Sequence, residues 1–299
     1  MTRLQDQLLN HGFGTPPIVL DGVLRRFVPE GGKKPTGWIA CNENHDSVVC
    51  VAGDWKTDKK VTVFEPKSGS HTTKPKANYE VERQIQKIAS ALKTRTRNLD
   101  AQESVHSVWN NATPCKTHPY LRRKKESDGD LRVDNYGNLV VPMFDTKGEH
   151  WNNQRINCHG SKFFSKGARV KECFYPIGSL VNGMTFVICE GSATGLTIQR
   201  ITGYTAIVAF TADNLLLVGK AIRKKYPDSK LIYAADDDRY SPVNIGKLKA
   251  TIAAKATDGI VVLPRFTCTK TKPTDFNDLY TLEGRSAVNS QFLEVTYGK

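Results

Sequence analysis

The stretch FVICEG (186–191) decides the fold of the C-terminal part of this chain, because it is an apolar run that ends on an acid and a glycine. Three more apolar runs follow, and segments with helical periodicity separate them: AIVAF (206–210), LIYAAD (231–236) and IVVLP (260–264), with helices expected near 193–201, 214–226 and 245–256. Continuous apolar strands that alternate with helices are typical of a parallel sheet covered by helices. We therefore expect an α/β domain over residues 182–299.

Acidic residues follow three of these predicted strands: Glu190, Asp236, Asp237, Asp238, Asp275 and Asp278. In an open parallel sheet the carboxyl ends of the strands meet at one edge, so these side chains should converge there. Carboxylates repel one another unless a cation lies between them, and Mg²⁺ takes one or two protein carboxylates together with substrate phosphates. The pattern therefore favours metal-assisted phosphoryl or nucleotidyl transfer. For Asp237 and Asp278 the alternative is that they only cap helices.

Strand geometry predicts which way the three acidic side chains at 236–238 point. Successive side chains of an extended segment point to opposite sides, so Asp236 and Asp238 should lie together and Asp237 should point away. Glu190, Asp236 and Asp238 are therefore the candidate catalytic residues and metal ligands. Asp237 is expected in a supporting position, and Asp275 and Asp278 are further candidate metal ligands.

Upstream of this domain, three segments differ in composition. Residues 1–66 contain short β-rich runs broken by Gly, Asp and Asn, and they predict a small antiparallel leader domain. Residues 67–111 contain a polar linker and then a helical pattern interrupted near Asn98, which fits two helices or one bent helix. Residues 112–181 predict a basic, β-rich meander with turns at Gly137, Gly148 and Gly160. The expected fold class is multidomain α+β.

The composition excludes several classes of protein. The chain has 43 Lys and Arg against 30 Asp and Glu, a formal charge of +13, which is typical of proteins that bind nucleic acid or polyphosphates. It contains no apolar run long enough to span a bilayer and starts without a signal peptide, so we expect a cytoplasmic protein that does not bind membranes. A Walker-type phosphate loop is absent, and the segment 191–195 is not a serine nucleophile elbow.

The seven cysteines are scattered and include no C-x-x-C pair. This usage predicts reduced, mostly buried thiols rather than disulfides or a redox motif. Cys41, His45 and Cys50 offer three ligands to a metal, but their spacing matches no common zinc pattern, and packing is the alternative. We therefore expect no structural zinc.

The order of the motifs resembles a Toprim domain of one particular group. VICEGSATGLTI (187–198), VAFTADNL (208–215), IYAADDD (232–238) and DFNDL (275–279) are similar to the TraC-like primases of conjugative plasmids, phages and integrative elements, which are relatives of bacterial DnaG-type primases. HPYLRRKK (118–125), LVVPMFDTKGEHWNNQRI (139–156) and KFFSKG (162–167) resemble the basic subdomain that precedes Toprim in that group. DGVLRRF (21–27), Gly37-Trp38 and the string 53–55 resemble, less specifically, a leader without zinc.

The resemblance implies a DNA primase that joins nucleoside triphosphates into short RNA primers on single-stranded DNA with Mg²⁺ or Mn²⁺. Glu190 would lie near the 3′-hydroxyl as metal ligand or general base, and Asp236 and Asp238 would hold the metal ions. A separate replicative helicase is implied as a partner. Two alternatives stay open, namely a Toprim-type nuclease and an inactive protein that binds single strands.

Candidate contacts to nucleic acid or nucleotides come from two regions. In the basic subdomain they are Arg122, Arg123, Lys124, Arg155 and Lys162, for which solvated surface charge is the alternative. In the leader, aromatic rings and cations occur together, as in proteins that stack bases: Arg25, Arg26, Trp38 and Trp55. For the two tryptophans, packing in a small β-domain is the alternative.

Overall fold

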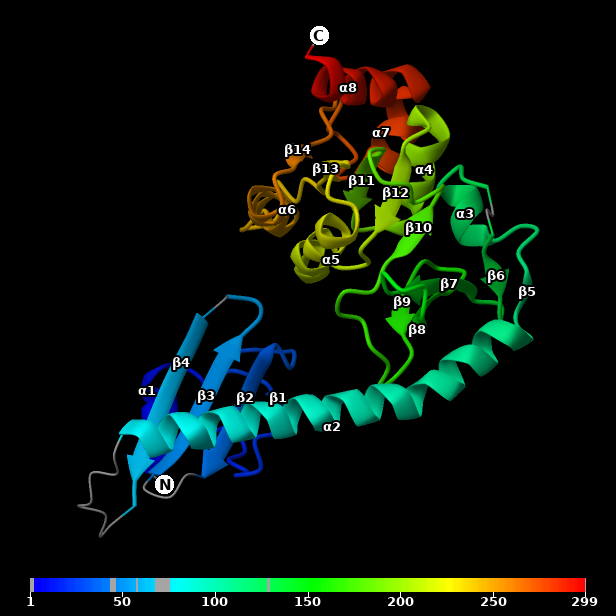
Figure 1. The fold of residues 1–299 in the computed structure, drawn as a ribbon. Coiled ribbons are helices and arrows are strands. Elements are labelled where there is room, and N and C mark those ends of the chain that lie inside the picture. The colour runs from blue at the N-terminus through cyan, green and yellow to red at the C-terminus, as the bar shows by residue number, and fades with distance from the viewer. Residues whose placement is uncertain (1–2, 44–46, 58, 68–75, 128–129, 299) are drawn as a thin grey trace. The chain divides into compact units, whose positions relative to one another are not determined.

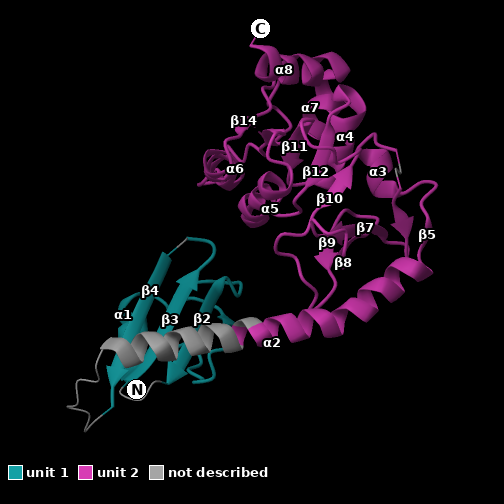
Figure 2. Cartoon of the chain, in the orientation of Figure 1, with its two compact units in different colours: residues 1–85 teal, residues 86–299 magenta. Residues whose placement is uncertain are grey.

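The chain, seen here as a computed structural model, folds into two compact units, residues 1–85 and 86–299 (Figure 1, Figure 2). The structure describes residues 3–43, 47–57, 59–67, 76–127 and 130–298, without the side chains of residues 76–89 and 91. The boundary between the units falls within one long helix. The predicted division into four segments is finer than these two units.

The first unit is a four-stranded antiparallel sheet with a short helix packed against one face. Its elements are α1 (Arg3–Asn10), β1 (Arg25–Phe27), β2 (Gly37–Glu43), β3 (Ser47–Asp54) and β4 (Lys59–Pro66), paired in the order β1-β2-β3-β4. Alternate residues of the strands point to the same face, so Ile39 and Ala52 join Leu4 and Leu8 of α1 in one buried cluster. The predicted antiparallel leader is confirmed.

Cys41 and Cys50 contradict the prediction that the cysteines are reduced. They lie directly opposite each other on β2 and β3, with their Cα atoms 4.1 Å apart, and they form a disulfide. The pairing depends on the register of the two strands, which sequence spacing alone does not fix. The bond also removes both cysteines as thiolate ligands for a metal, and His45 lies outside the described residues.

The long helix α2 (Lys76–Asn111) is continuous, so a single helix is formed rather than two. Its C-terminal half is anchored on the second unit by hydrogen bonds to β8 (His150–Ile156). The Asn153 side-chain amide donates to the Val105 carbonyl at 2.8 Å, and the Gln102 amide donates to the His150 carbonyl at 3.1 Å. Val105 itself is fully buried.

A five-stranded antiparallel sheet follows in the second unit, as predicted for the basic subdomain. It consists of β5 (Thr113–Pro114), β6 (Arg132–Val133), β7 (Leu139–Phe144), β8 and β9 (Lys162–Phe164), in the order β5-β6-β7-β8-β9, with the short helix α3 (Pro119–Arg123) beside it. Its turns contain Gly137, Gly148 and Gly160, each with a positive φ. A residue with a side chain is strained in that conformation, which explains why glycine stands at each turn.

The second sheet of this unit is mostly parallel. It consists of β10 (Tyr175–Ile177), β11 (Thr185–Cys189), β12 (Thr205–Val208), β13 (Lys230–Ala234) and β14 (Ile260–Val262), in the order β10-β12-β11-β13-β14. Only β10, among these five, runs antiparallel to its neighbour. The helices that accompany it are α4 (Ser192–Thr202), α5 (Ala212–Lys225), α6 (Ile245–Ala256), α7 (Phe276–Glu283) and α8 (Arg285–Tyr297).

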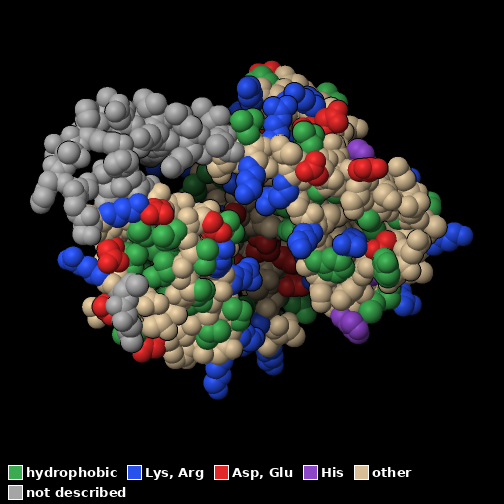
Figure 3. Space-filling model, turned by 90° about the horizontal axis from the view of Figure 1, so that it is seen from below, with side chains coloured by type: hydrophobic (Ala, Val, Ile, Leu, Met, Phe, Trp, Pro, Cys, Tyr) green, Lys and Arg blue, Asp and Glu red, His purple; other side chains and the backbone are tan. Residues whose placement is uncertain are grey.

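The apolar strands are continuous because this sheet is buried on both faces. Phe186 and Ile188 belong to the cluster that includes residues of α5 and α6, whereas Val187 and Cys189 belong to the cluster that includes residues of α4, α7 and α8. None of the helices in the described part of the chain is both long and apolar enough to cross a bilayer. Lys and Arg side chains are spread over the face seen in Figure 3 rather than gathered in one patch.

Candidate active site

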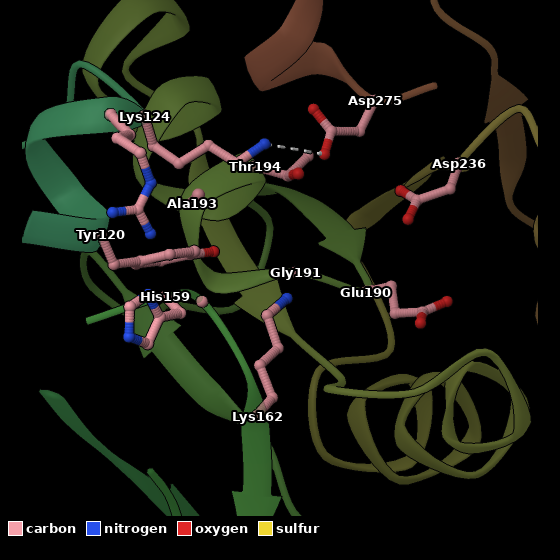
Figure 4. A pocket seen from close by; sticks show the side chains of 12 residues that line it. Tyr120, Lys124, His159, Lys162, Glu190, Gly191, Ala193, Thr194, Asp236 and Asp275 are labelled. Atoms are coloured by element: carbon pink, nitrogen blue, oxygen red, sulfur yellow. Dashed lines mark ion pairs between the residues drawn. The ribbon is translucent and has the colours of Figure 1, made fainter. Parts of the chain in front are cut away.

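Three carboxylates, two after strands and one at the start of a helix, line one cavity of about 350 Å³ (Figure 4). Glu190 directly follows β11, and Asp236 lies two residues beyond β13. Asp275 precedes α7 and caps it, since its Oδ1 accepts a hydrogen bond of 2.7 Å from the Asp278 amide. The parallel sheet therefore brings acids that are far apart in sequence to one edge, as the position of its strand ends requires.

Burial disfavours the charged form of each of these acids. It raises the pKa of Glu190 to about 7, with Asp238 adding to the effect and Lys162 opposing it. Burial, followed by repulsion from Asp275 and Glu190, raises the pKa of Asp236 well above its usual value. The pKa of Asp275 is also raised by burial, although Lys124 opposes the shift. Carboxylates held in this way gain from a bound cation.

One oxygen of Asp236 points to the same conclusion. Its Oδ1 is buried and has no hydrogen-bond partner among the described residues. A buried acceptor without a partner costs free energy, which a cation beside Glu190 and Asp275 would recover. Within the described residues no three His, Cys, Asp or Glu side chains close around a single point as a complete metal cage would. The donor set fits an ion that uses one or two carboxylates and completes its shell with water and phosphate oxygens.

Cations lie between these acids and the far side of the cavity. Lys124 Nζ is 3.1 Å from Asp278 Oδ1 and 3.9 Å from Asp275 Oδ2. These two acids raise the pKa of Lys124 against the opposing effect of burial. Lys162 enters from β9, and a Cβ built on Gly191 would lie 3.9 Å from its Nζ. Gly191 thus leaves open the space between the start of α4 and this ammonium group.

The other predicted acids have separate roles. Asp237 points to the opposite side of the loop from Asp236, where it pairs with Arg239 and accepts a hydrogen bond of 2.6 Å from Asn244. Asp238 does not line the cavity, and its Oδ2 accepts from the Gly246 amide at 2.9 Å. Asp278 is bound by the Thr274 amide and by Lys124.

The structure brings three of the five basic candidates together. Arg123, Lys124 and Lys162 line the cavity, whereas Arg122 and Arg155 do not. Arg155 instead lies over the ring of Phe163, with 4.8 Å between its guanidinium carbon and the ring centroid.

Six cavity residues were not among the predicted site residues: Tyr120, His159, Gly160, Gly191, Ala193 and Thr194. Tyr120 lies in the string HPYLRRKK, of which only the cations were predicted to bind nucleic acid or nucleotides. His159 and Gly160 were predicted only to form a turn. The buried carboxylate of Glu126 was also missed. It accepts hydrogen bonds from Thr197 at 2.6 Å and from Arg200 at 2.7 and 3.1 Å, which ties the segment after α3 to α4.

The aromatic and basic candidates of the first unit form a separate group. The Trp38 and Trp55 rings lie 6.0 Å apart, and Arg26 lies 4.8 Å above the Trp55 ring. Trp55 is 53% exposed. Arg25 is engaged elsewhere, since both of its terminal nitrogens donate to Asp21.

A protein-family model described as "Toprim domain" matches residues 185–286. This segment contains Glu190, Asp236 and Asp275 and the strands that place them. Residues 185–286 are a Toprim domain. Domains of this family generally bind a divalent metal ion. The match lies within residues 182–299, over which the Toprim domain was predicted.

The chain is similar to the TraC DNA primases. Two TraC proteins of Escherichia coli are each 29% identical to it over 267 and 268 residues. The alignments cover 85% of this chain but 18% and 25% of those proteins, so the chain spans about a quarter or less of their length. Among solved structures, the primase fragment of the bacteriophage T7 primase-helicase superposes with a TM-score of 0.48 at 12% identity, over 90% of this chain and 100% of that one.

Proposed function

We propose that this protein is a DNA primase, which synthesises short RNA primers on single-stranded DNA by metal-dependent nucleotidyl transfer. The observation that carries the proposal is the cavity in which Glu190, Asp236 and Asp275 face Lys124 and Lys162. Acids that hold cations and lysines that hold phosphates are the two parts that this reaction needs. The Toprim domain and the similarity to TraC DNA primases support the same activity.

Each acid has a role in this proposal. A divalent ion, Mg²⁺ or Mn²⁺, would be held by Asp236 and Asp275 and, when bound, would neutralise charge on the triphosphate. Asp238 is the predicted second ligand beside Asp236, and Oδ1 is the oxygen left for that role because Oδ2 accepts from Gly246. Glu190, with a pKa raised to about 7, takes the proton of the attacking 3′-hydroxyl at neutral pH. Zinc has no part in this chemistry.

The cations divide between nucleotide and template. Arg123, Lys124 and Lys162 line the cavity and are proposed to bind nucleoside triphosphates. Arg122 and Arg155, outside it, are proposed to contact the DNA backbone, together with the Trp38, Trp55 and Arg26 group of the first unit. We further propose that the protein works in the cytoplasm with a replicative helicase on a separate chain.

The experiment that tests the function uses one reaction mixture. It contains the full chain, single-stranded DNA, labelled nucleoside triphosphates and Mg²⁺ or Mn²⁺, with a chelator-treated sample as control. Short labelled products that appear with time, and that the chelator abolishes, support a primase. Shortened DNA would indicate a nuclease instead, and DNA that is retarded in a gel but chemically unchanged would indicate an inactive single-strand binder.

A further inference from the structure

The end of the cavity opposite the carboxylates has no role in the metal chemistry. Figure 4 shows Tyr120 and His159 on one side, the three acids on the other, and Lys124 and Lys162 between them. Tyr120 is a buried residue, with 5% of its surface exposed, yet it contributes to the wall of this polar cavity.

The ring of Tyr120 is fixed by its surroundings. It lies in the first turn of α3, where His118 caps the helix by accepting a hydrogen bond from the Tyr120 amide at 3.2 Å. A Cβ built on Gly160 would lie 3.5 Å from Tyr120 Cδ2, so the turn between β8 and β9 packs directly against the ring. The ring also belongs to the main core cluster, beside Leu121. A phenol held this firmly presents its hydroxyl at one defined point.

That hydroxyl points into the cavity (Figure 4). Within the described residues no hydrogen bond to it is found. The hydroxyl is therefore available to a ligand that brings an acceptor into the cavity. A tyrosine hydroxyl can donate a hydrogen bond to an anionic oxygen.

The neighbours of Tyr120 indicate which acceptor this is. Arg123, Lys124 and Lys162 line the same cavity, the two lysines between Tyr120 and the acids, and the open start of α4 at Gly191 has no side-chain cap. Cations and free helix amides both favour phosphate oxygens. A ligand that meets metal-binding acids at one end and these donors at the other has the charge pattern of a nucleoside triphosphate, with its α-phosphate toward the acids.

We propose that Tyr120 donates a hydrogen bond to the β- or γ-phosphate of the nucleoside triphosphate and is thereby a substrate-binding residue of this site. The proposal rests on the proposed function for the identity of the nucleotide, but the contact itself is to the polyphosphate tail. Tyr120→Phe removes the hydroxyl and keeps the packed ring. Tyr175→Phe is the matched control, because Tyr175 is also buried in the second unit but does not line the cavity.

The test measures the binding of inorganic tripolyphosphate and of a nucleoside monophosphate by calorimetry, with Mg²⁺ present, to the full chain and to both variants. We expect Tyr120→Phe to weaken tripolyphosphate binding roughly tenfold, the loss of one hydrogen bond to a charged group. The monophosphate and the Tyr175→Phe variant should show no such change. In primer synthesis, the KM for the nucleoside triphosphate should rise by a similar factor with kcat within about twofold.

Three results would overturn the proposal: tripolyphosphate that binds equally to wild type and Tyr120→Phe, a wild type that does not bind it, or weakening confined to the monophosphate. The last result would place the hydroxyl against the sugar or base. Because calorimetry needs no turnover, a wild type that binds tripolyphosphate but makes no primer would refute the proposed function and leave the Tyr120 contact standing.

Discussion

At the scale of single residues, the ionised acids of the cavity destabilise the folded protein, and a bound metal ion would remove that effect. The pKa of Glu190 is raised from 4.5 to about 7, and those of Asp236 and Asp275 are raised as well. Between pH 4.5 and 7, the folded protein holds a proton on Glu190 that the unfolded chain has lost. The metal-free protein therefore loses stability as pH rises through this window, and the full penalty is present above it.

The direction of this pH dependence gives the first prediction. Mg²⁺ competes with protons for these carboxylates, so it should raise the melting temperature at pH 8 by about 3–5 °C when present at ten times its Kd. At pH 5 the shift should be much smaller, because the acids are largely protonated. Thermal unfolding followed by circular dichroism, with Na⁺ at equal ionic strength as control, measures both shifts. Equal shifts at the two pH values would show that Mg²⁺ acts elsewhere.

The convergence of the cavity acids could be predicted from the sequence, but the hydrogen-bond partners of their neighbours could not. Glu190 and Asp236 follow apolar strands, whose carboxyl ends meet at one edge of a parallel sheet, whereas Asp275 reaches the cavity from the start of α7. Asp238 does not line the cavity, because one of its oxygens, Oδ2, accepts a hydrogen bond from the Gly246 amide at the start of α6. That contact joins residues on either side of a loop, which side-chain alternation along a strand cannot predict.

At the scale of elements, the segment that follows α3 is bound to the Toprim domain through a buried ion pair. The Glu126 side chain is fully buried and pairs with Arg200, which also lies 4.5 Å above the Tyr280 ring. Asn277 of α7 donates to the Lys124 carbonyl at 2.7 Å and to Thr197 at 2.9 Å. These contacts fix the backbone from which Lys124 reaches the acids.

Glu126→Gln should therefore destabilise the protein by about 2–3 kcal/mol, because it leaves the partly buried Arg200 charge without its counter-ion. Glu294→Gln is the control, since its pair with Arg265 is exposed and should be worth less than about 1 kcal/mol. Urea unfolding of the two variants gives both values. If Glu126→Gln were no more destabilising than Glu294→Gln, the ion pair would not be what fixes this segment.

The Glu126–Arg200 ion pair could not be predicted from the sequence. Glu126 and Arg200 are 74 positions apart, and neither lies in a motif, so only the fold, which places the segment after α3 beside α4, makes them partners. The Cys41–Cys50 disulfide escaped prediction for a similar reason, because it follows from the register of β2 and β3. Strands β11 to β14 and helices α4 to α6, by contrast, were predicted to within about two residues of their ends, because apolar strands and amphipathic helices alternate there, whereas α7 and α8 were not predicted.

At the scale of the whole molecule, a charge of +13 favours DNA binding through the phosphate backbone. The logarithm of the affinity for single strands should then fall with the logarithm of the salt concentration by about 0.7 per contacted phosphate.

A stacked base adds affinity without adding to that slope. Trp55→Ala should thus weaken binding of single-stranded DNA by about 5- to 150-fold, the loss of 1–3 kcal/mol, with an unchanged salt slope. Tyr297→Ala, another exposed aromatic, should leave affinity unchanged. Anisotropy titrations at several salt concentrations would refute the stacking role if the two variants behaved alike.

The proposal that nucleotides are joined in this cavity can be tested by measuring primer synthesis in Asp236→Asn and Asp237→Asn side by side. The two changes remove one negative charge each from adjacent positions, but Asp236 faces the cavity and Asp237 faces Arg239 on the other side. The account predicts that Asp236→Asn lowers the rate of primer synthesis by at least a hundredfold, with single-strand affinity within a few-fold of wild type, while Asp237→Asn retains most of the activity. Equal activity in the two variants, whether retained or lost, would contradict it.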